Sequence, residues 1–166
     1  MCWQSTILNK QIAAECVPVV KVCELYYPFA VLYSGGAVFY KSPYHSFVYS
    51  FSPAEKVNLI VNTHKGSKEF LSGKTYYTIE AGYHCYNPEV DILFDGKDRL
   101  YDGFDLATVT SKNGTVVGKY NSQSLVYVEM LIPRGSEYYE NEYGEIVASS
   151  LKVKEHSKMI RVYETF

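Results

Sequence analysis

The sequence predicts an α+β fold that is mainly antiparallel β-sheet, with one or two short helices. Three observations predict it. Residues Leu125–Ile132 alternate in strand fashion, with Val126, Val128, Met130 and Ile132 on one apolar face. Leu106–Val117 contains Asn113-Gly114 between alternating residues, a strong short signal for a β-hairpin. The chain also holds 17 tyrosines, and tyrosine rings favour strands and half-wet surfaces.

Strands are expected wherever apolar and aromatic runs are bounded by turn residues. Ser34-Gly35-Gly36 is expected to join two short strands, and Ser42-Pro43-Tyr44 to interrupt the pattern before the next one. The expected strands of the first half of the chain are Val17–Leu25, Ala30–Tyr33, Ala37–Tyr40, His45–Phe51 and Lys74–Glu80.

Two local signals predict the starts of short helices. Ser52 offers an N-cap, Pro53 suits the first helical position and Glu55 lies three residues after the cap, so we expect a helix that ends near Val61. Asn87-Pro88-Glu89 repeats the signal, and we expect Asp95-Gly96 to close that helix.

The last third of the chain holds the segment that the sequence favours as a binding site. Pro133–Ser136 ends the preceding strand because proline cannot donate to a ladder and glycine permits a turn. A further strand is expected at Glu145–Val153. Between them lies EYYENEYGE, residues 137–145, in which four carboxylates alternate with three tyrosines. A polar, aromatic loop between two strands is a common way to present binding groups.

The composition predicts a single domain, residues 1–166, that is long enough to bury a core. A net charge of −2 gives no electrostatic case for nucleic acid as a partner. No apolar run reaches the length of a membrane span, and the N-terminus lacks the pattern of a signal peptide, so we expect a cytosolic protein. Reduced thiols fit that compartment, and they are expected at Cys2, Cys16, Cys23 and Cys85.

The sequence does not favour cysteine catalysis, a calcium loop or a zinc site. His84 and Cys85 point to opposite faces of an extended segment, so they cannot form a nucleophilic pair. The aspartates of DGKDRLYDGFD, residues 95–105, lack calcium-loop spacing and are expected to form a solvated loop. No cysteine pair has zinc spacing, so no metal site is expected.

Glu145 is the residue that the sequence most favours as a functional carboxylate. Counting by twos from Val153 brings Glu145 onto the apolar face of its strand, at the rim of the core. Burial there would raise the pKa of its carboxyl unless a cation such as Arg134 paired with it. This position of Glu145 is consistent with a functional site and also with a structural salt bridge at the rim of the core. The residues expected to bind a ligand are Tyr83, His84, Tyr86, Arg134, Tyr138, Tyr139, Glu142, Tyr143 and Glu145.

The chain resembles a family of small proteins of gut Bacteroidota and of their phages and prophages. Five blocks of sequence carry the resemblance: Met1-Cys2, Ser42-Pro43-Tyr44, Gly82–Tyr86, Ile132–Tyr139 and Gly144–Ser149. The last two blocks are the most specific. The sequence departs from that pattern at Ser52–Val61 and Leu106–Val117. The family carries no established activity, so the resemblance implies provenance.

A weaker resemblance, to ADP-ribosyltransferases, rests on the ending NEYGEIVAS, residues 141–149. It implies a split sheet in which Glu142 or Glu145 orients the ribose of NAD, with Gly82-Tyr83-His84 near the aromatic ring that stacks on nicotinamide. A matching first-strand signature is missing, so the likeness is one of fold.

These observations predict a non-enzymatic accessory protein of phage or prophage type that uses no cofactor. It would bind a host protein or a nucleotide-like small ligand through its tyrosine-rich surface and counter host defence. The alternative is an ADP-ribosyltransferase-like enzyme that uses NAD and Glu145 as the catalytic residue. A minor virion protein is a third interpretation and predicts a homo-oligomer.

Overall fold

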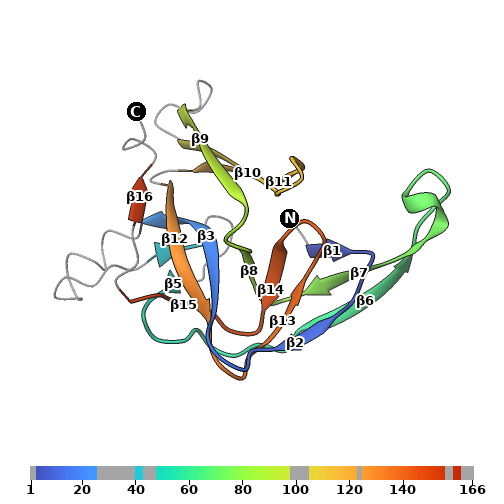
Figure 1. The fold of residues 1–166 in the computed structure, drawn as a ribbon, viewed down its shortest axis with the longest axis horizontal. Helices are drawn as coiled ribbons and strands as arrows, with labels where there is room; N and C mark the ends of the chain where they lie inside the picture. Colours follow the sequence, from blue (N-terminus) through green and yellow to red (C-terminus); the bar gives the residue numbers. More distant parts are fainter. Residues whose placement is uncertain are drawn as a thin grey trace.

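The computed structural model (Figure 1) describes residues 3–25, 40–42, 48–97, 105–122, 125–155 and 159–161. In these ranges the chain is almost entirely β-strand, joined by turns, with one short 3₁₀ turn, η1, at Leu71–Gly73. The strands are β1 (Trp3–Ser5), β2 (Lys10–Ile12), β3 (Val17–Leu25), β4 (Tyr40–Lys41), β5 (Val48–Tyr49), β6 (Ile60–Lys65), β7 (Thr75–Glu80), β8 (Tyr83–Tyr86), β9 (Asp91–Lys97), β10 (Asp105–Thr110), β11 (Val116–Ser122), β12 (Leu125–Ile132), β13 (Glu137–Glu140), β14 (Glu145–Ala148), β15 (Lys152–Val153) and β16 (Met159–Arg161).

The centre of the molecule is the antiparallel pair of β3 and β12. Their register runs from Leu125 opposite Glu24 to Ile132 opposite Val17, so every residue of β12 has a partner on β3. These two strands belong to a ten-stranded sheet with the order β15-β12-β3-β8-β14-β13-β2. Strands β16, β4 and β5 complete this sheet off the main path.

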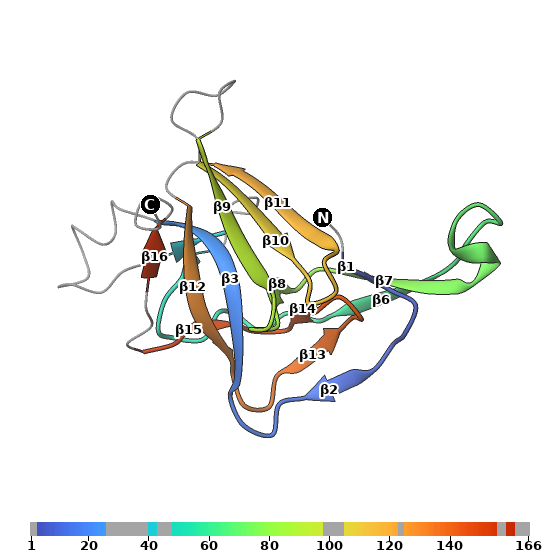
Figure 2. The same ribbon diagram turned by 45° about the horizontal axis from the view of Figure 1, so that its top comes forward.

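Two smaller sheets complete the fold. Strands β9, β10 and β11 form a three-stranded antiparallel sheet that lies beside β3 and β12 in Figures 1 and 2. Strands β6 and β7 form a long hairpin that projects from the body of the molecule, and β1 pairs with β7 along the part nearest the body.

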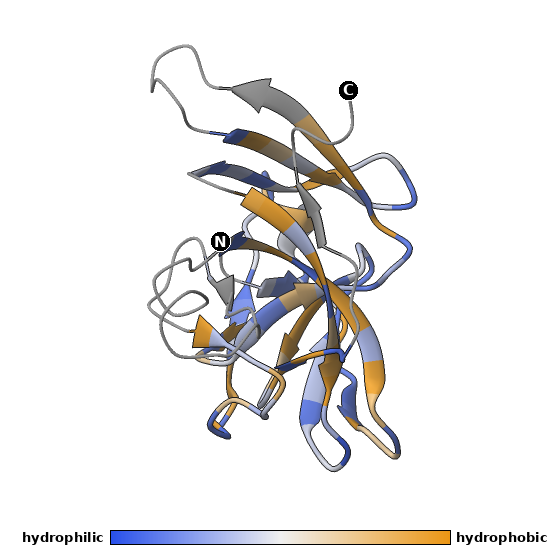
Figure 3. Cartoon of the chain, turned by 90° about the vertical axis from the view of Figure 1, so that its left-hand side faces the viewer, coloured by the Kyte–Doolittle hydropathy of each residue, from blue (hydrophilic) through white to orange (hydrophobic). Residues whose placement is uncertain are grey.

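Both faces of the large sheet are covered. Alternate residues of β12 enter two different cores, as strand geometry requires: Val126 and Val128 face one, while Leu125 faces the other. Figure 3 shows the result, with hydrophobic stretches in the strands and hydrophilic residues at the turns. The main core consists of Ala13, Val19, Cys23, Tyr49, Tyr83, Cys85, Val126, Val128, Met130, Ile132, Ile146, Ala148, Leu151 and Val153.

Two further cores join the smaller sheets to the large one. The second core lies between the large sheet and β10 and β11, and it consists of Val20, Val22, Tyr86, Val90, Ala107, Val109, Val117 and Leu125. The third core consists of Trp3, Ile79, Tyr139 and Val147, and it fastens β1 and β7 to β13 and β14.

The mainly antiparallel β architecture is confirmed, and so are several of its elements. The strands expected at Val17–Leu25, Lys74–Glu80 and Leu125–Ile132 are β3, β7 and β12, within one residue. The Asn113-Gly114 turn joins β10 to β11. Ala30–Tyr33 and most of Ala37–Tyr40 lie outside the described residues. Of His45–Phe51, the described part is a strand only at Val48–Tyr49.

The prediction of a helix at Ser52–Val61 is wrong. Residues 52–59 are irregular, and strand β6 begins at Ile60. The backbone here pairs with another segment instead of with itself: Ala54 N–H donates to the Leu151 carbonyl at 2.9 Å, and Val57 N–H to the Ser149 carbonyl at 2.9 Å. The N-cap signature is local, and tertiary pairing overrides it.

The helix expected after Asn87-Pro88-Glu89 is also absent from the described residues. Asn87 Oδ1 accepts the N–H of Glu89 at 2.9 Å, which forms a side-chain-closed turn, and β9 follows it. Asparagine favours such turns and helix caps for the same reason, because its side chain bonds the backbone two residues on. No described helix is long and apolar enough to span a membrane.

The last expected strand, Glu145–Val153, is two strands that pair with different neighbours. Strand β14 pairs with β13 and β8, whereas β15 pairs with β12. The segment 137–145 is therefore a hairpin and not an open loop, because residues 137–140 form β13 opposite β14.

Candidate functional site

The candidate site is built around the turn Asn141–Gly144, which joins β13 to β14. Asn141 N–H donates to the Glu145 carbonyl at 3.0 Å, and Gly144 N–H donates to the Asn141 carbonyl at 3.2 Å. Gly144 has φ of +77°, a left-handed conformation that glycine adopts without steric cost. Such a tight turn holds the two residues at its tip, Glu142 and Tyr143, away from the sheet.

The side chain of Asn141 fixes this turn from the inside. It is buried, and its Oδ1 accepts the N–H groups of Tyr143 and Glu145, each at 3.0 Å. Its Nδ2 donates to the Gln4 carbonyl at 2.9 Å and to Glu145 Oε1 at 3.2 Å. One amide therefore ties together the turn, the carboxylate of Glu145 and the backbone of β1.

Glu145 lies at the rim of the core, as its position in the sequence predicts. It shares a face of β14 with Val147 of the third core, and its carboxylate is half-buried. Burial raises the pKa of its carboxyl, and the charge of Glu142 adds to that effect while the hydrogen bond from Asn141 opposes it. Its backbone carbonyl accepts the Trp3 Nε1–H at 3.0 Å, which anchors β1 at this point.

Glu142 connects the turn to β1 through hydroxyl donors. Ser5 Oγ donates to Glu142 Oε2 at 3.0 Å, and Thr6 Oγ1 donates to Glu142 Oε1 at 3.4 Å. Ser5 is buried and Thr6 is exposed, so the carboxylate of Glu142 lies where strand β1 meets solvent.

These groups border a cavity of about 300 Å³ between the turn, β1 and β11. Its walls combine carboxylates, hydroxyls, one tyrosine ring and short aliphatic side chains. The lining residues are Gln4, Ser5, Thr6, Leu71, Thr115, Val116, Val117, Glu142, Tyr143 and Glu145. Such a surface accepts hydrogen bonds from hydroxyl or amino groups and offers an aromatic ring for stacking.

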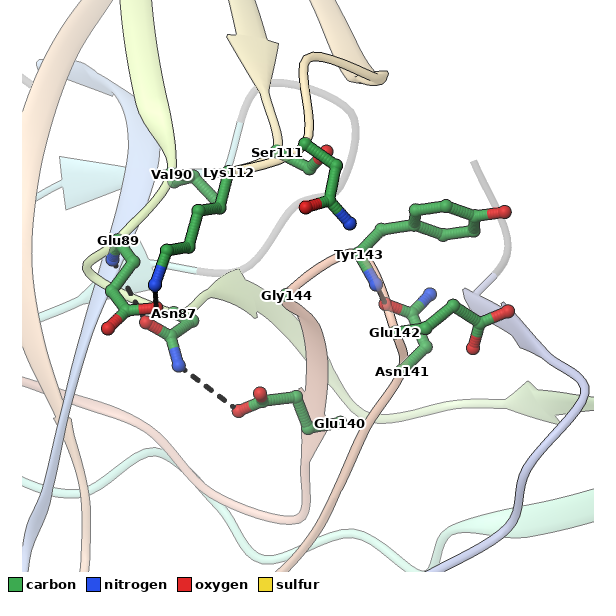
Figure 4. A pocket seen from close by; sticks show the side chains of 11 residues that line it. Asn87, Glu89, Val90, Ser111, Lys112, Glu140, Asn141, Glu142, Tyr143 and Gly144 are labelled. Atoms are coloured by element: carbon green, nitrogen blue, oxygen red, sulfur yellow. Dashed lines mark hydrogen bonds and ion pairs between the residues drawn. The ribbon is translucent and has the colours of Figure 1, made fainter.

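A second hollow, of about 150 Å³, lies on the other side of the same turn (Figure 4). Its polar groups are matched with one another: Lys112 Nζ is 3.8 Å from Glu89 Oε2, and Asn87 Nδ2 donates to Glu140 Oε1 at 3.5 Å. Figure 4 shows Glu142 and Tyr143 directed away from these pairs. The larger cavity is therefore the better candidate for a ligand.

The structure brings together three of the nine predicted binding residues, Glu142, Tyr143 and Glu145. Arg134 does not join them. It lies in the turn between β12 and β13, at the opposite end of β13 from the Asn141–Gly144 turn, so it cannot be the cation that pairs with Glu145.

Three predicted binding tyrosines belong to the cores instead. The ring of Tyr83 is in the main core, and its hydroxyl donates to the Glu55 carbonyl at 2.6 Å. Tyr86 is buried in the second core, with its Oη 2.6 Å from Tyr120 Oη. Tyr139 is buried in the third core, with its ring centroid 6.1 Å from that of Trp3.

The remaining two have structural surroundings as well. Tyr138 is half-buried and packs against the main core. The backbone carbonyl of His84 accepts a hydrogen bond from Lys21 Nζ, and its side chain is half-buried on β8. Neither residue lines the described cavities.

The site also contains residues that the sequence did not indicate. Gln4, Ser5 and Thr6 come from the N-terminal segment, Leu71 comes from η1, and Thr115–Val117 come from the end of the β10–β11 turn and the start of β11. No local pattern singles them out, because they reach the site only through the pairing of β1 with β7 and the packing of the β9–β11 sheet.

Cys85 and Asp105, which the sequence did not favour as reactive or metal-binding groups, are both buried. Cys85 is buried in the main core, and burial raises the pKa of its thiol to about 12, so it does not present a thiolate. Asp105 is buried, and its Oδ2 accepts the N–H of Leu125 at 3.1 Å, so at this position the expectation of a solvated loop is wrong. Within the described residues, no group of histidine, cysteine and acidic side chains could hold a metal ion.

No protein-family model, curated protein or solved structure matches the chain. The resemblance to the family of Bacteroidota and phage proteins and the resemblance to ADP-ribosyltransferases therefore stay predictions.

Proposed function

We propose that this chain is a non-enzymatic binding protein that takes its ligand in the cavity beside the Asn141–Gly144 turn. One observation carries the proposal: Glu142, Tyr143 and Glu145 border a single cavity of about 300 Å³ on a turn that Asn141 holds in place. A rigid turn that presents an exposed ring and a carboxylate loses little conformational entropy when it binds a ligand.

The lining residues favour the sugar and base of a nucleotide-like ligand. Carboxylates accept hydrogen bonds from ribose hydroxyls, and the half-exposed ring of Tyr143 is available for stacking. The volume is at the lower end of the range for small-molecule sites. No lysine or arginine lines this cavity, so a phosphate group would have to project from it into solvent.

The same chemistry fits a second source of ligand, the lysine or arginine side chain of a host protein. The resemblance to proteins of Bacteroidota phages and prophages supports this part of the proposal. An accessory protein of that origin acts in the cytoplasm of the bacterial host, and blocking a defence protein there would be its role.

The test is a titration of the protein with adenosine, with NAD and with an arginine-containing peptide, followed by nuclear magnetic resonance and calorimetry. Saturable binding of any of them should weaken by about fivefold or more in Tyr143→Ala and in Glu142→Gln. Phe51→Ala and Glu155→Gln are matched controls, because both residues are exposed and neither lines the cavity. Binding that survives both site variants would contradict the proposal.

The alternative, an ADP-ribosyltransferase-like enzyme, is favoured by the half-buried carboxylate of Glu145 beside the cavity. Against it, the ring of Tyr83 is only 4% exposed, so it is not available to stack on nicotinamide. Incubation with labelled NAD and cell extract separates the two proposals. Label transfer by the wild type but not by Glu145→Gln would establish the enzyme, and transfer by neither would remove it.

A further inference from the structure

The hairpin of β6 and β7 carries its own surface, distant from the main core. Six residue pairs join the strands, from Ile60 opposite Glu80 to Lys65 opposite Thr75. The hairpin projects from the body in both Figure 1 and Figure 2. We call residues 64–76, at its far end, the hairpin tip.

The hairpin tip is held in a defined shape by its own hydrogen bonds. Gly66 N–H donates to the Lys74 carbonyl at 2.9 Å, and Gly73 N–H donates to the Ser67 carbonyl at 2.7 Å. Phe70 N–H donates to Ser67 Oγ at 3.1 Å. Leu71 and Ser72 have φ of +56° and +51°, a left-handed conformation that costs free energy for residues other than glycine. The unfavourable conformations of Leu71 and Ser72 are therefore part of the hydrogen-bonded turn at the tip.

Three aromatic rings lie together on the hairpin tip. The rings of His64 and Tyr76 are stacked, with centroids 4.9 Å apart and planes inclined by 18°. Phe70 meets Tyr76 edge to face, with centroids 5.3 Å apart. His64 is exposed and Phe70 is 44% exposed, so two of these rings reach solvent. Rings held in this way offer flat surfaces for stacking by other planar groups.

The same tip carries three lysines. Lys65, Lys68 and Lys74 are exposed, and Glu69 is the single acidic residue of the tip. None of the three lysines lies within ion-pair distance of a carboxylate in the described parts of the chain. The tip therefore has a net charge of +2 (three lysines and one glutamate), and the rest of the chain has a net charge of −4 (13 basic and 17 acidic residues).

We propose that the hairpin tip binds single-stranded nucleic acid. Unpaired bases stack on aromatic side chains, and lysines neutralise the phosphates between them. An anionic membrane fits less well, because interfacial binding scales with buried apolar area and Phe70 is the only large apolar side chain of the tip that is exposed. The net charge of −2 conceals this surface, since it averages the tip with an acidic body. None of the rings or lysines of the tip lines the cavity beside the Asn141–Gly144 turn, to which the tip contributes only Leu71.

Fluorescence anisotropy with a labelled oligothymidine of about 15 nucleotides tests the proposal. The wild type should bind it at low salt, and Phe70→Ala should weaken binding by about fivefold or more, the effect of losing one stacked base. The triple variant Lys65→Gln, Lys68→Gln, Lys74→Gln should lower the slope of log K against log salt by about two, because each phosphate contact on a single strand contributes about 0.7.

A matched triple variant, Lys10→Gln, Lys56→Gln, Lys154→Gln, removes the same charge from exposed positions outside the tip. It should bind the oligothymidine as the wild type does. Equal weakening in both triple variants would reduce the effect to net charge and overturn the proposal. So would an absence of oligothymidine binding, or binding of phosphatidylserine vesicles but not of oligothymidine. Thermal melts of all variants distinguish lost binding from lost folding.

Discussion

The side chain of Asn141 bonds Glu145 twice, once through the backbone N–H of Glu145 to Asn141 Oδ1 at 3.0 Å and once from Asn141 Nδ2 to the Glu145 carboxylate at 3.2 Å. Asn141 itself is buried, and the Glu145 side chain is half-buried. The amide therefore sets both the shape of the turn and the position of the carboxylate.

Replacement of Asn141 should destabilise the fold. Asn141→Ala leaves the N–H groups of Tyr143 and Glu145 and the Gln4 carbonyl without their partner, at a cost of about 1–3 kcal/mol. Chemical denaturation would measure it. Asn113→Ala, in the exposed turn between β10 and β11, is the control and should change stability by less than about 0.5 kcal/mol. Equal effects would mean that Asn141 does not organise the turn.

Glu145 should make stability depend on pH in an unusual direction. Burial raises the pKa of its carboxyl above its ordinary 4.5, so between the two values the folded chain holds more proton than the unfolded chain. Stability from this group is therefore lost as the pH rises through that window. Relative to the wild type, Glu145→Gln should gain stability as the pH rises above the ordinary pKa of 4.5. If the difference in stability between Glu145→Gln and the wild type does not change with pH in this region, the raised pKa of Glu145 is contradicted.

Lys21 should act in the opposite sense. Its ammonium is buried in the main core, where it donates to the His84 carbonyl and lies 5.6 Å from the ring centroid of Tyr49, and burial lowers its pKa from the ordinary 10.5. Only the unfolded chain is then fully protonated below pH 10.5, so this group adds stability as the pH rises towards that value.

Lys21→Met should accordingly be more stable than the wild type by about 1 kcal/mol or more at pH 7, because it removes the cost of burying a cation. That advantage should shrink towards pH 10. Lys154→Met, at an exposed position, should show neither effect. A loss of stability in Lys21→Met that is the same at both pH values would show that its hydrogen bond outweighs its burial.

Gly118 should tolerate no side chain. A Cβ atom built there lies 2.3 Å from Tyr86 Oη, closer than real Cβ atoms approach a neighbour, and 3.1 Å from Tyr120 Cε2, a tight contact. Gly118→Ala should therefore cost about 1–3 kcal/mol of stability. Adding Tyr86→Phe removes the nearer atom, so the double variant should lose less than the sum of the two single losses. Strict additivity in this cycle would contradict the proposed contact.

The cysteines should separate by accessibility. Cys16 is exposed and should react at once with a thiol reagent in the native state. Cys23 and Cys85 are buried, and burial raises the pKa of each thiol to about 12, so both should react only after denaturation. A Cys2→Ser background keeps the count to these three. A disulfide that must first be reduced would contradict both the structure and the predicted cytoplasmic location.

The sequence predicts the fold best where a local pattern and the tertiary structure agree. Strand β12 was predictable because its alternation matches burial on both faces, and the β10–β11 hairpin because Asn113-Gly114 fits only a few turns. Prediction failed at Ser52–Val61, where a helix signature competes with the bonds from Ala54 and Val57 to the segment 149–151. No property of residues 52–55 reports on that distant segment.

The candidate site was predictable only from one side. Glu142, Tyr143 and Glu145 follow from the composition of the turn, but the other lining residues are residues 4–6, Leu71 and residues 115–117. Tyr83, Tyr86 and Tyr139 were expected to bind a ligand but lie in the cores, because a tyrosine ring in a strand fits a core as well as a surface. Tyr83 and Tyr86 do the former, with their hydroxyls satisfied by Glu55 and Tyr120.

The pairing of β3 with β12 has a consequence for synthesis. About a hundred residues separate Glu24 from its partner Leu125, and 142 separate Trp3 from Glu145, whose carbonyl it binds. At roughly 5–20 residues per second, β3 waits for several seconds on the ribosome before β12 emerges. During that interval the backbone of β3 lacks the strand with which it pairs, and non-local sheets close slowly even when the chain is complete. The central pair of the large sheet therefore forms late, because its two strands lie far apart in the sequence.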